Sequence, residues 1–233
     1  MPKPYASNSR TMPSRGLFFA LGLGIGVWSL GSSAAVSPAE LDFDRTFSEA
    51  GEPASLYFKA RYGVPGAAHT LELWRLGQAH LLRKTGARIE TYVTRSSKEP
   101  EFQMTVLDHQ RHIASHVSRN SLYKVGSFID WFDLAHGLRR PVGHYELVRA
   151  TTPPDVTAPI EDCQWFELHT GTTTDRLCWS ARYRIPLVIY SMARSAVVWS
   201  VEQVSTRPVS LARFRVDETG FVINNADRDI EQD

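Results

Sequence analysis

Residues 55–76 read SLYFKARYGVPGAAHTLELWRL, and this stretch decides the fold class. Both halves alternate apolar and polar side chains, which is the period of a β-strand that buries one face. In the second half, Leu71, Leu73 and Arg75 share one face. The Val-Pro-Gly at 64–66 separates the halves and is typical of a turn. The stretch therefore predicts two antiparallel strands joined by a short loop.

Further segments with a strand pattern follow this pair at close, even spacing. They span residues 80–83, 88–95, 102–107, 112–117, 145–149, 164–168, 176–183, 187–190 and 197–204. Evenly spaced strands with short turns indicate an antiparallel meander, either in a sandwich or in a curved sheet. We therefore expect a mostly β, α+β fold: a curved antiparallel sheet or incomplete β-barrel.

One segment interrupts the strands with a helical pattern. Residues 127–138, SFIDWFDLAHGL, carry a wide apolar face at helical spacing. Ser127 suits the N-cap with Asp130 three residues later, Gly137 suits the end, and Pro141 prevents the helix from resuming. We expect this helix to lie over the sheet as a lid.

The chain contains two cysteines, Cys163 and Cys178. In an oxidising compartment two lone cysteines pair, and Gly171 to Thr174 between them reads as a hairpin turn that places them on neighbouring strands. A redox-active or metal-binding pair is the alternative, but the spacing is not that of a Cys-x-x-Cys motif. The sequence therefore predicts a structural disulfide.

The first 35 residues have the order of a secretion signal. Lys3, Arg10 and Arg15 precede an uncharged apolar stretch over residues 16–30, and small residues follow it. Cleavage after Ala35 or after Ala34 fits this pattern, and no cysteine lies near the cut. The alternative is an uncleaved segment that anchors the protein in the inner membrane, facing the periplasm. We expect a periplasmic protein with a signal peptide at 1–35, one β domain at 36–223 and a polar tail at 224–233.

Several classes of chemistry find no support in the residues. The net charge of +1 gives no electrostatic case for nucleic-acid binding. His109, His112 and His116 would share a helix face, but they fall on a turn and a strand, where His112 and His116 stand too far apart to bind one metal ion. There is no Gly-x-Ser-x-Gly motif and no other catalytic constellation. We therefore expect no enzyme activity, no cofactor and no metal.

The order of segments resembles the LolA/LolB-like superfamily of periplasmic lipoprotein carriers. The segments that carry the resemblance are LELWR at 71–75, RIETYV at 88–93, NSLYKVG at 120–126, WFDLAHGL at 131–138 and FRVDETGFV at 214–222. The resemblance implies an incomplete β-barrel lidded by helices around an apolar cavity. This chain differs in its pair of cysteines and in lacking a lipid-modified cysteine at the signal.

These observations lead to a functional expectation. We expect the open barrel to bind a lipid or an acylated protein, with strand and helix aromatics lining the cavity. The expected lining residues are Phe58, Trp74, Tyr92, Met104, Phe128, Trp131 and Phe132. The alternative is an interaction or sensor module with a packed interior that meets an envelope protein. Contact with a membrane is expected only through an uncleaved signal segment.

Overall fold

The structure is a computed structural model that describes residues 40–96, 100–127, 129–153, 156–158, 160, 163–171 and 173–232. The chain divides into two units, Met1–Ser37 and Pro38–Asp233, and all the described residues belong to the second. The expected signal peptide at 1–35 lies outside the described residues. Among the described helices, none combines the length and apolar character needed to cross a membrane.

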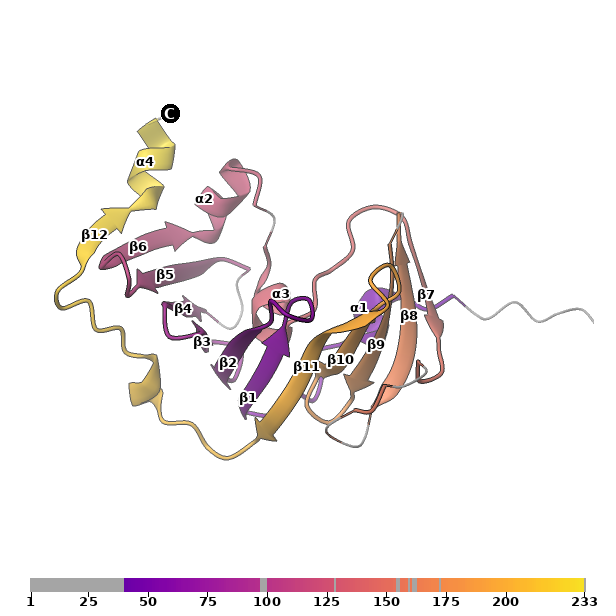
Figure 1. Cartoon of the computed structure of the whole chain (residues 1–233). Helices are drawn as coiled ribbons and strands as arrows, with labels where there is room; N and C mark the ends of the chain where they lie inside the picture. Colours follow the sequence, from indigo (N-terminus) through magenta and orange to yellow (C-terminus); the bar gives the residue numbers. More distant parts are fainter. Residues whose placement is uncertain are drawn as a thin grey trace, which may run out of the picture. The chain divides into compact units, whose positions relative to one another are not determined.

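The second unit is built on one sheet, in agreement with the expected fold class (Figure 1). Its strands are β1 (Ser55–Tyr62), β2 (His69–Leu76), β3 (His80–Thr85), β4 (Ile89–Arg95), β5 (Phe102–Asp108), β6 (Ile113–Ser118), β7 (Tyr145–Arg149), β8 (Gln164–Thr170), β9 (Thr173–Ser180), β10 (Ile185–Ser191), β11 (Ala196–Ser205) and β12 (Val222–Asn225). The helices are α1 (Phe43–Thr46), α2 (Arg119–Lys124), α3 (Trp131–His136), α4 (Ala226–Gln232) and the 3-10 helix η1 (Leu211–Phe214).

The strand order is β12-β6-β5-β4-β3-β2-β1-β11-β10-β9-β8-β7. The two meanders, β1 to β6 and β7 to β11, join where β11 pairs with β1, with Phe58 opposite Val204. The described pairs are antiparallel except for β12, which runs parallel to β6. Because β12 and β7 do not pair with each other, the sheet is curved but open, as an incomplete barrel requires.

The sequence pattern sets which face of each strand is buried. Leu56, Phe58 and Leu73 are almost fully buried on the inner face, where they form one core cluster with Trp131 and Leu134 of α3. A second cluster contains aromatic side chains of α1, α3, β8 and β9. The expected helical lid is therefore present on the inner face of the sheet.

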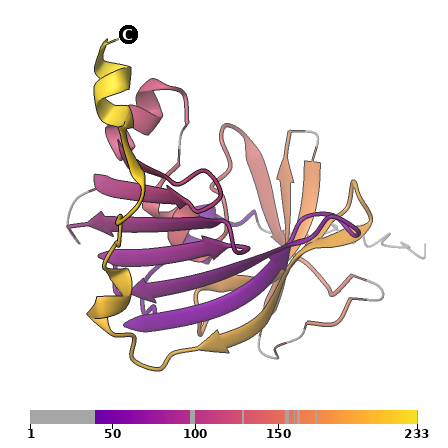
Figure 2. The ribbon, with the colours of Figure 1, turned by 60° about the vertical axis from the view of Figure 1, so that its left-hand side comes forward.

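The outer face of β2 to β6 is covered by the chain after β11, as the view in Figure 2 shows. Phe214 of η1 packs there with Leu82, Tyr92 and Leu107. The chain then adds β12 beside β6, and the Val222 N–H donates to the His112 carbonyl at 2.8 Å. Both faces of this half of the sheet are thus buried, one by α3 and one by the C-terminal segment.

Several element boundaries differ from the expectation, among them the following. The helix expected over 127–138 spans only Trp131–His136, because Asp130 rather than Ser127 is the N-cap. The strand expected to reach residue 183 ends at Ser180, since the turn that follows places Arg184 at φ 56°. The polar residues from 224 do not form a loose end but continue through β12 into α4, whose Asp227 accepts a hydrogen bond from the Ser118 N–H at 2.7 Å.

Candidate functional site

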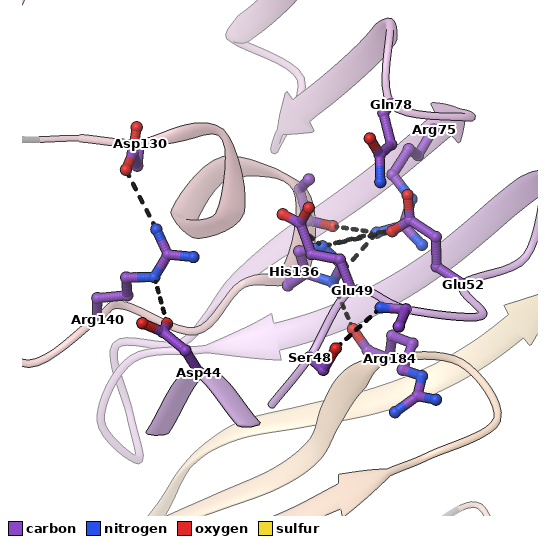
Figure 3. A network of polar contacts seen from close by, with 12 residues as sticks. Asp44, Ser48, Glu49, Glu52, Arg75, Gln78, Asp130, His136, Arg140 and Arg184 are labelled. Atoms are coloured by element: carbon purple, nitrogen blue, oxygen red, sulfur yellow. Dashed lines mark hydrogen bonds and ion pairs between the residues drawn. The ribbon is translucent and has the colours of Figure 1, made fainter. Parts of the chain in front are cut away.

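Helix α3 positions the candidate site, although it is only six residues long. The Asp130 N–H donates to Asp133 Oδ2 at 3.1 Å and closes the first turn. Trp131, Phe132 and Ala135 are buried against the sheet. So short a helix is marginal by itself, and tertiary packing must hold it in place. Its last residue, His136, is also fully buried, and it belongs to a polar network (Figure 3).

The network joins α3 to β2 and to the loop before β1. Arg75, on the inner face of β2, has no exposed surface, and its Nη1 lies 3.0 Å from Glu52 Oε2. The same nitrogen lies 3.2 Å from the His136 ring and 3.4 Å from the Ala135 carbonyl. Burial lowers the pKa of Arg75, and the negative charges of Glu52 and Glu49 oppose that shift. One buried guanidinium therefore holds the C-terminal end of α3 to the sheet.

The two ring nitrogens of His136 share Arg75 as a neighbour, each 3.2 Å from its Nη1, and otherwise have different partners. Nδ1 lies 2.5 Å from the carbonyl oxygen of Arg184, in the turn between β9 and β10. Because a carbonyl only accepts, Nδ1 carries the proton. Nε2 faces Glu52 at 3.5 Å and Glu49 at 3.7 Å. The side-chain interaction with His136 lowers the pKa of Glu49 below its ordinary value of 4.5, while partial burial acts in the opposite direction.

Residues 137–142, directly after this anchor, form one wall of a cavity of about 630 Å3. The facing wall comes from β8, β9, β10 and β11. Most of the side chains that line it are aliphatic: Leu138, Val142, Leu168, Leu177, Ile189 and Val198. Mostly apolar cavities of this size, with few polar groups, are typical small-molecule sites.

The charged groups at the cavity are arginines and one aspartate. Arg140 is held by Asp44 at 2.9 Å and Asp130 at 3.2 Å, and its guanidinium lies over the Phe132 ring. Arg139 is exposed, whereas Asp175 is half-buried on β9. The cavity can therefore accept an apolar chain and offers a cation at its entrance.

The expected lining residues lie elsewhere and divide between the two faces of the sheet. Phe58, Trp131 and the partly buried Met104 belong to the core cluster beneath α3, and Phe132 packs with Phe43 of α1. Trp74 and Tyr92 lie on the outer face, in the cluster that contains Phe214 of η1, and Phe128 lies outside the described residues. None of the described six lines the 630 Å3 cavity.

The sequence does not reveal this cavity, because its lining carries no aromatic signal. Its walls are aliphatic residues spread over the four consecutive strands β8 to β11, together with the loop after α3. The one local signal is the segment GLRRPVG at 137–143, in which apolar residues flank two arginines between glycines.

The cysteine prediction is confirmed. Cys163 and Cys178 form a disulfide, with Cα atoms 5.3 Å apart, and Cys178 pairs with Trp165 across β8 and β9. His109 faces Glu90 and His116 faces Glu218, whereas the rings of His109 and His112 both pack against Phe221. Among the residues that the structure describes, no group of three or more His, Cys, Asp or Glu side chains could hold a metal ion.

Comparisons with known proteins give only weak likenesses of fold. No protein-family model matches the chain, and no curated protein matches it. A solved structure described as the crystal structure of MucB aligns with a TM-score of 0.41 and 11% sequence identity. The alignment covers 77% of this chain and 63% of that chain. This is a weak resemblance of fold only.

Proposed function

We propose that this protein is an exported, non-enzymatic carrier that binds an apolar or amphipathic molecule, such as a lipid or the acyl chain of a protein. The observation that carries the proposal is the aliphatic cavity between residues 137–142 and β8 to β11. Burying an acyl chain there gains about 0.8 kcal/mol for each methylene removed from water. The N-terminal signal pattern supports a periplasmic location, with an inner-membrane anchor as its alternative.

The buried network supports the same function by fixing the cavity wall. Arg75, Glu52 and His136 are enclosed, so they anchor the structure and offer no reactive group to a substrate. The wall at residues 137–142 begins at the next residue after His136. A rigid wall lowers the cost of binding, because less of the protein must be ordered when the ligand enters.

The first experiment is native mass spectrometry of protein purified from the periplasm without detergent, followed by solvent extraction. A co-purifying lipid or acyl species supports the proposal and identifies the ligand class. N-terminal sequencing of the same sample decides between cleavage after Ala34, cleavage after Ala35 and a retained anchor.

A substitution that fills the cavity tests where the ligand binds. Ile189→Trp places a large ring in the cavity, so it should abolish retention of a fluorescent fatty acid. Val197→Trp is the matched control, because Val197 lies on the neighbouring strand and lines a different hollow, beside the β1–β2 hairpin. Equal binding by the two variants would contradict this site.

A second candidate function follows from the packed aromatic core. Phe58 and Trp131 are fully or almost fully buried, so the space beneath α3 is filled by side chains. That packing favours an interaction module which meets an envelope protein through its surface. A ligand-free mass, together with fatty-acid binding that Ile189→Trp does not change, would favour this function over the carrier.

A further inference from the structure

Three exposed apolar side chains lie in loops at one end of the sheet. Val64 is 37% exposed, Met192 is 41% exposed and Val142 is 85% exposed. Each lies in a loop: 63–68 between β1 and β2, 192–195 between β10 and β11, and 137–144 between α3 and β7. We call these three loops the rim.

Backbone contacts place the rim loops at the same end. The Gly63 N–H donates to the Val198 carbonyl at 2.9 Å, at the start of β11. The Met192 N–H donates to the Thr174 carbonyl at 3.0 Å, at the start of β9. The turn at Gly171 lines the same cavity as Val142. Figure 1 shows the β1–β2 and β10–β11 loops at corresponding ends of their strands.

The charge of the rim is of one sign. Its three loops contain Arg139, Arg140 and Arg194 and no aspartate or glutamate. Arg140 is paired with Asp44 and Asp130. Arg139 and Arg194 are exposed, and neither has an ion-pair partner among the described residues. The rim therefore carries two exposed arginines, Arg139 and Arg194, beside its three exposed apolar side chains.

This combination points to a particular partner. We infer that the rim docks on an anionic lipid surface, with Val64, Val142 and Met192 entering the headgroup region. Isolated apolar side chains on separate loops can insert into the deformable headgroup layer of a membrane. A folded protein partner would instead need a continuous apolar patch to pack against. Arg139 and Arg194 add electrostatic attraction to anionic lipids, which falls off within a Debye length. This inference does not require that the cavity binds a ligand.

The test uses the compact unit Pro38–Asp233, which contains every described element and all three core clusters, so that the apolar segment before it does not bind vesicles itself. Co-sedimentation is measured with vesicles of equal parts phosphatidylglycerol and phosphatidylcholine, and with phosphatidylcholine alone. We expect binding to the anionic vesicles, weaker binding at high salt, and little binding to phosphatidylcholine alone.

Matched variants locate the contact. The triple variant Val64→Asp/Val142→Asp/Met192→Asp should weaken binding at least tenfold. Its control makes the same change at three exposed apolar residues elsewhere, Val125, Leu211 and Val222, and should lose far less. Circular dichroism checks that both triple variants keep their strands.

The arginines have a control of equal charge. Arg139→Ala/Arg194→Ala should weaken binding about fivefold for each arginine removed. Arg207→Ala/Arg215→Ala removes the same charge from the exposed C-terminal segment and should have a smaller effect. Equal losses from the rim and control variants would overturn the inference. Absence of vesicle binding by the unaltered unit would also overturn the inference, and it would favour a protein as the partner of the rim.

Discussion

The indole ring of Trp199 fills the space that a side chain on residue 137 would need. A Cβ built on Gly137 would lie 2.8 Å from Cη2 of Trp199, and Gly137 has a φ of 68°. Trp199 has little freedom to move, because its Nε1–H donates to the Pro186 carbonyl at 2.8 Å and its ring packs against Phe58. Glycine at this position therefore lets α3 end directly on β11 and begins the cavity wall.

Gly137→Ala should consequently destabilise the protein through two effects. A left-handed backbone costs a residue with a Cβ about 1–2 kcal/mol, and overpacking against Trp199 adds about 1–3 kcal/mol. Gly143→Ala is the control, because Gly143 has a φ of 81° but no atom within 4 Å of its Cβ position. Urea unfolding should show a larger loss at Gly137, and equal losses at the two positions would contradict the role of Trp199.

The strands and their buried faces were predictable from the sequence, because the alternation of side chains within each strand decides which face is buried. Leu71 and Leu73 alternate with the polar residues Thr70 and Glu72, and the structure buries both on the inner face together with Arg75. The same pattern could not reveal why Arg75 is tolerated there. Its partners, Glu52 and His136, come from a loop and a helix end, and only the tertiary fold brings them together.

Removing one partner of the buried Arg75–Glu52 ion pair should lower the free energy of unfolding substantially. Arg75→Met leaves the Glu52 carboxylate, which is 8% exposed, without its cation. Removing one partner of a buried ion pair costs about 3–5 kcal/mol. The double variant Arg75→Met/Glu52→Leu should lose less than the sum of the single variants, because neither charge is then left unpaired.

Urea unfolding of the four proteins in this cycle gives the coupling free energy. Arg88→Met is the control, since Arg88 pairs with Asp108 while half of its own side chain stays exposed. That substitution should change the free energy of unfolding very little. Strict additivity of Arg75→Met and Glu52→Leu would show that the two charges do not interact.

Glu49 should make stability depend on pH. Its pKa is lowered in the folded protein, chiefly by His136, with further contributions from Arg95 and Arg140. A carboxyl whose folded pKa is depressed stabilises the fold fully above its unfolded value, near 4.5 here, and loses that contribution as the pH falls through the folded pKa. The stability advantage of the unaltered protein over Glu49→Gln should therefore shrink below pH 4.5.

The measurement is urea unfolding of both proteins from pH 7 to pH 3. Comparison at each pH cancels the titration of groups that lie far from residue 49 in both proteins. A stability difference that stays constant over this range would indicate that Glu49 does not interact with His136 in the folded protein.

The candidate cavity was less predictable than the sheet, for a physical reason. Aromatic side chains such as Trp131 and Phe58 dominate the sequence signal, but large rings also fill a core efficiently, and here they do so. The cavity lies where smaller side chains, such as Val198 and Ile189, leave space opposite the loop after α3. Whether these residues enclose a cavity depends on how β8 to β11 of the second meander lie against the loop after α3, and no single segment of the sequence shows it.

The sequence pattern also did not predict that the C-terminal segment covers the sheet. Replacing one side chain tests how much this segment contributes to the stability of the fold. Phe214 is 7% exposed and packs beside His80, in the outer cluster that also contains Leu82 and Tyr92. Phe214→Ala should cost about 3–5 kcal/mol, because the cavity left behind adds to the lost burial. Leu211, in the same 3-10 helix, is 57% exposed, so Leu211→Ala should change the free energy of unfolding by less than about 0.5 kcal/mol.

Limited proteolysis tests whether Phe214 holds the C-terminal segment firmly on the sheet. If Phe214 holds the segment on the sheet, Phe214→Ala should speed cleavage within residues 206–221, and Leu211→Ala should not. Other contacts also hold the segment, among them the Val209 N–H donating to Ser55 Oγ at 3.3 Å, the ion pair of Glu218 with His116 at 2.8 Å and the short β12. Equal cleavage rates in both variants would mean that β12 and α4 hold this part of the chain without Phe214.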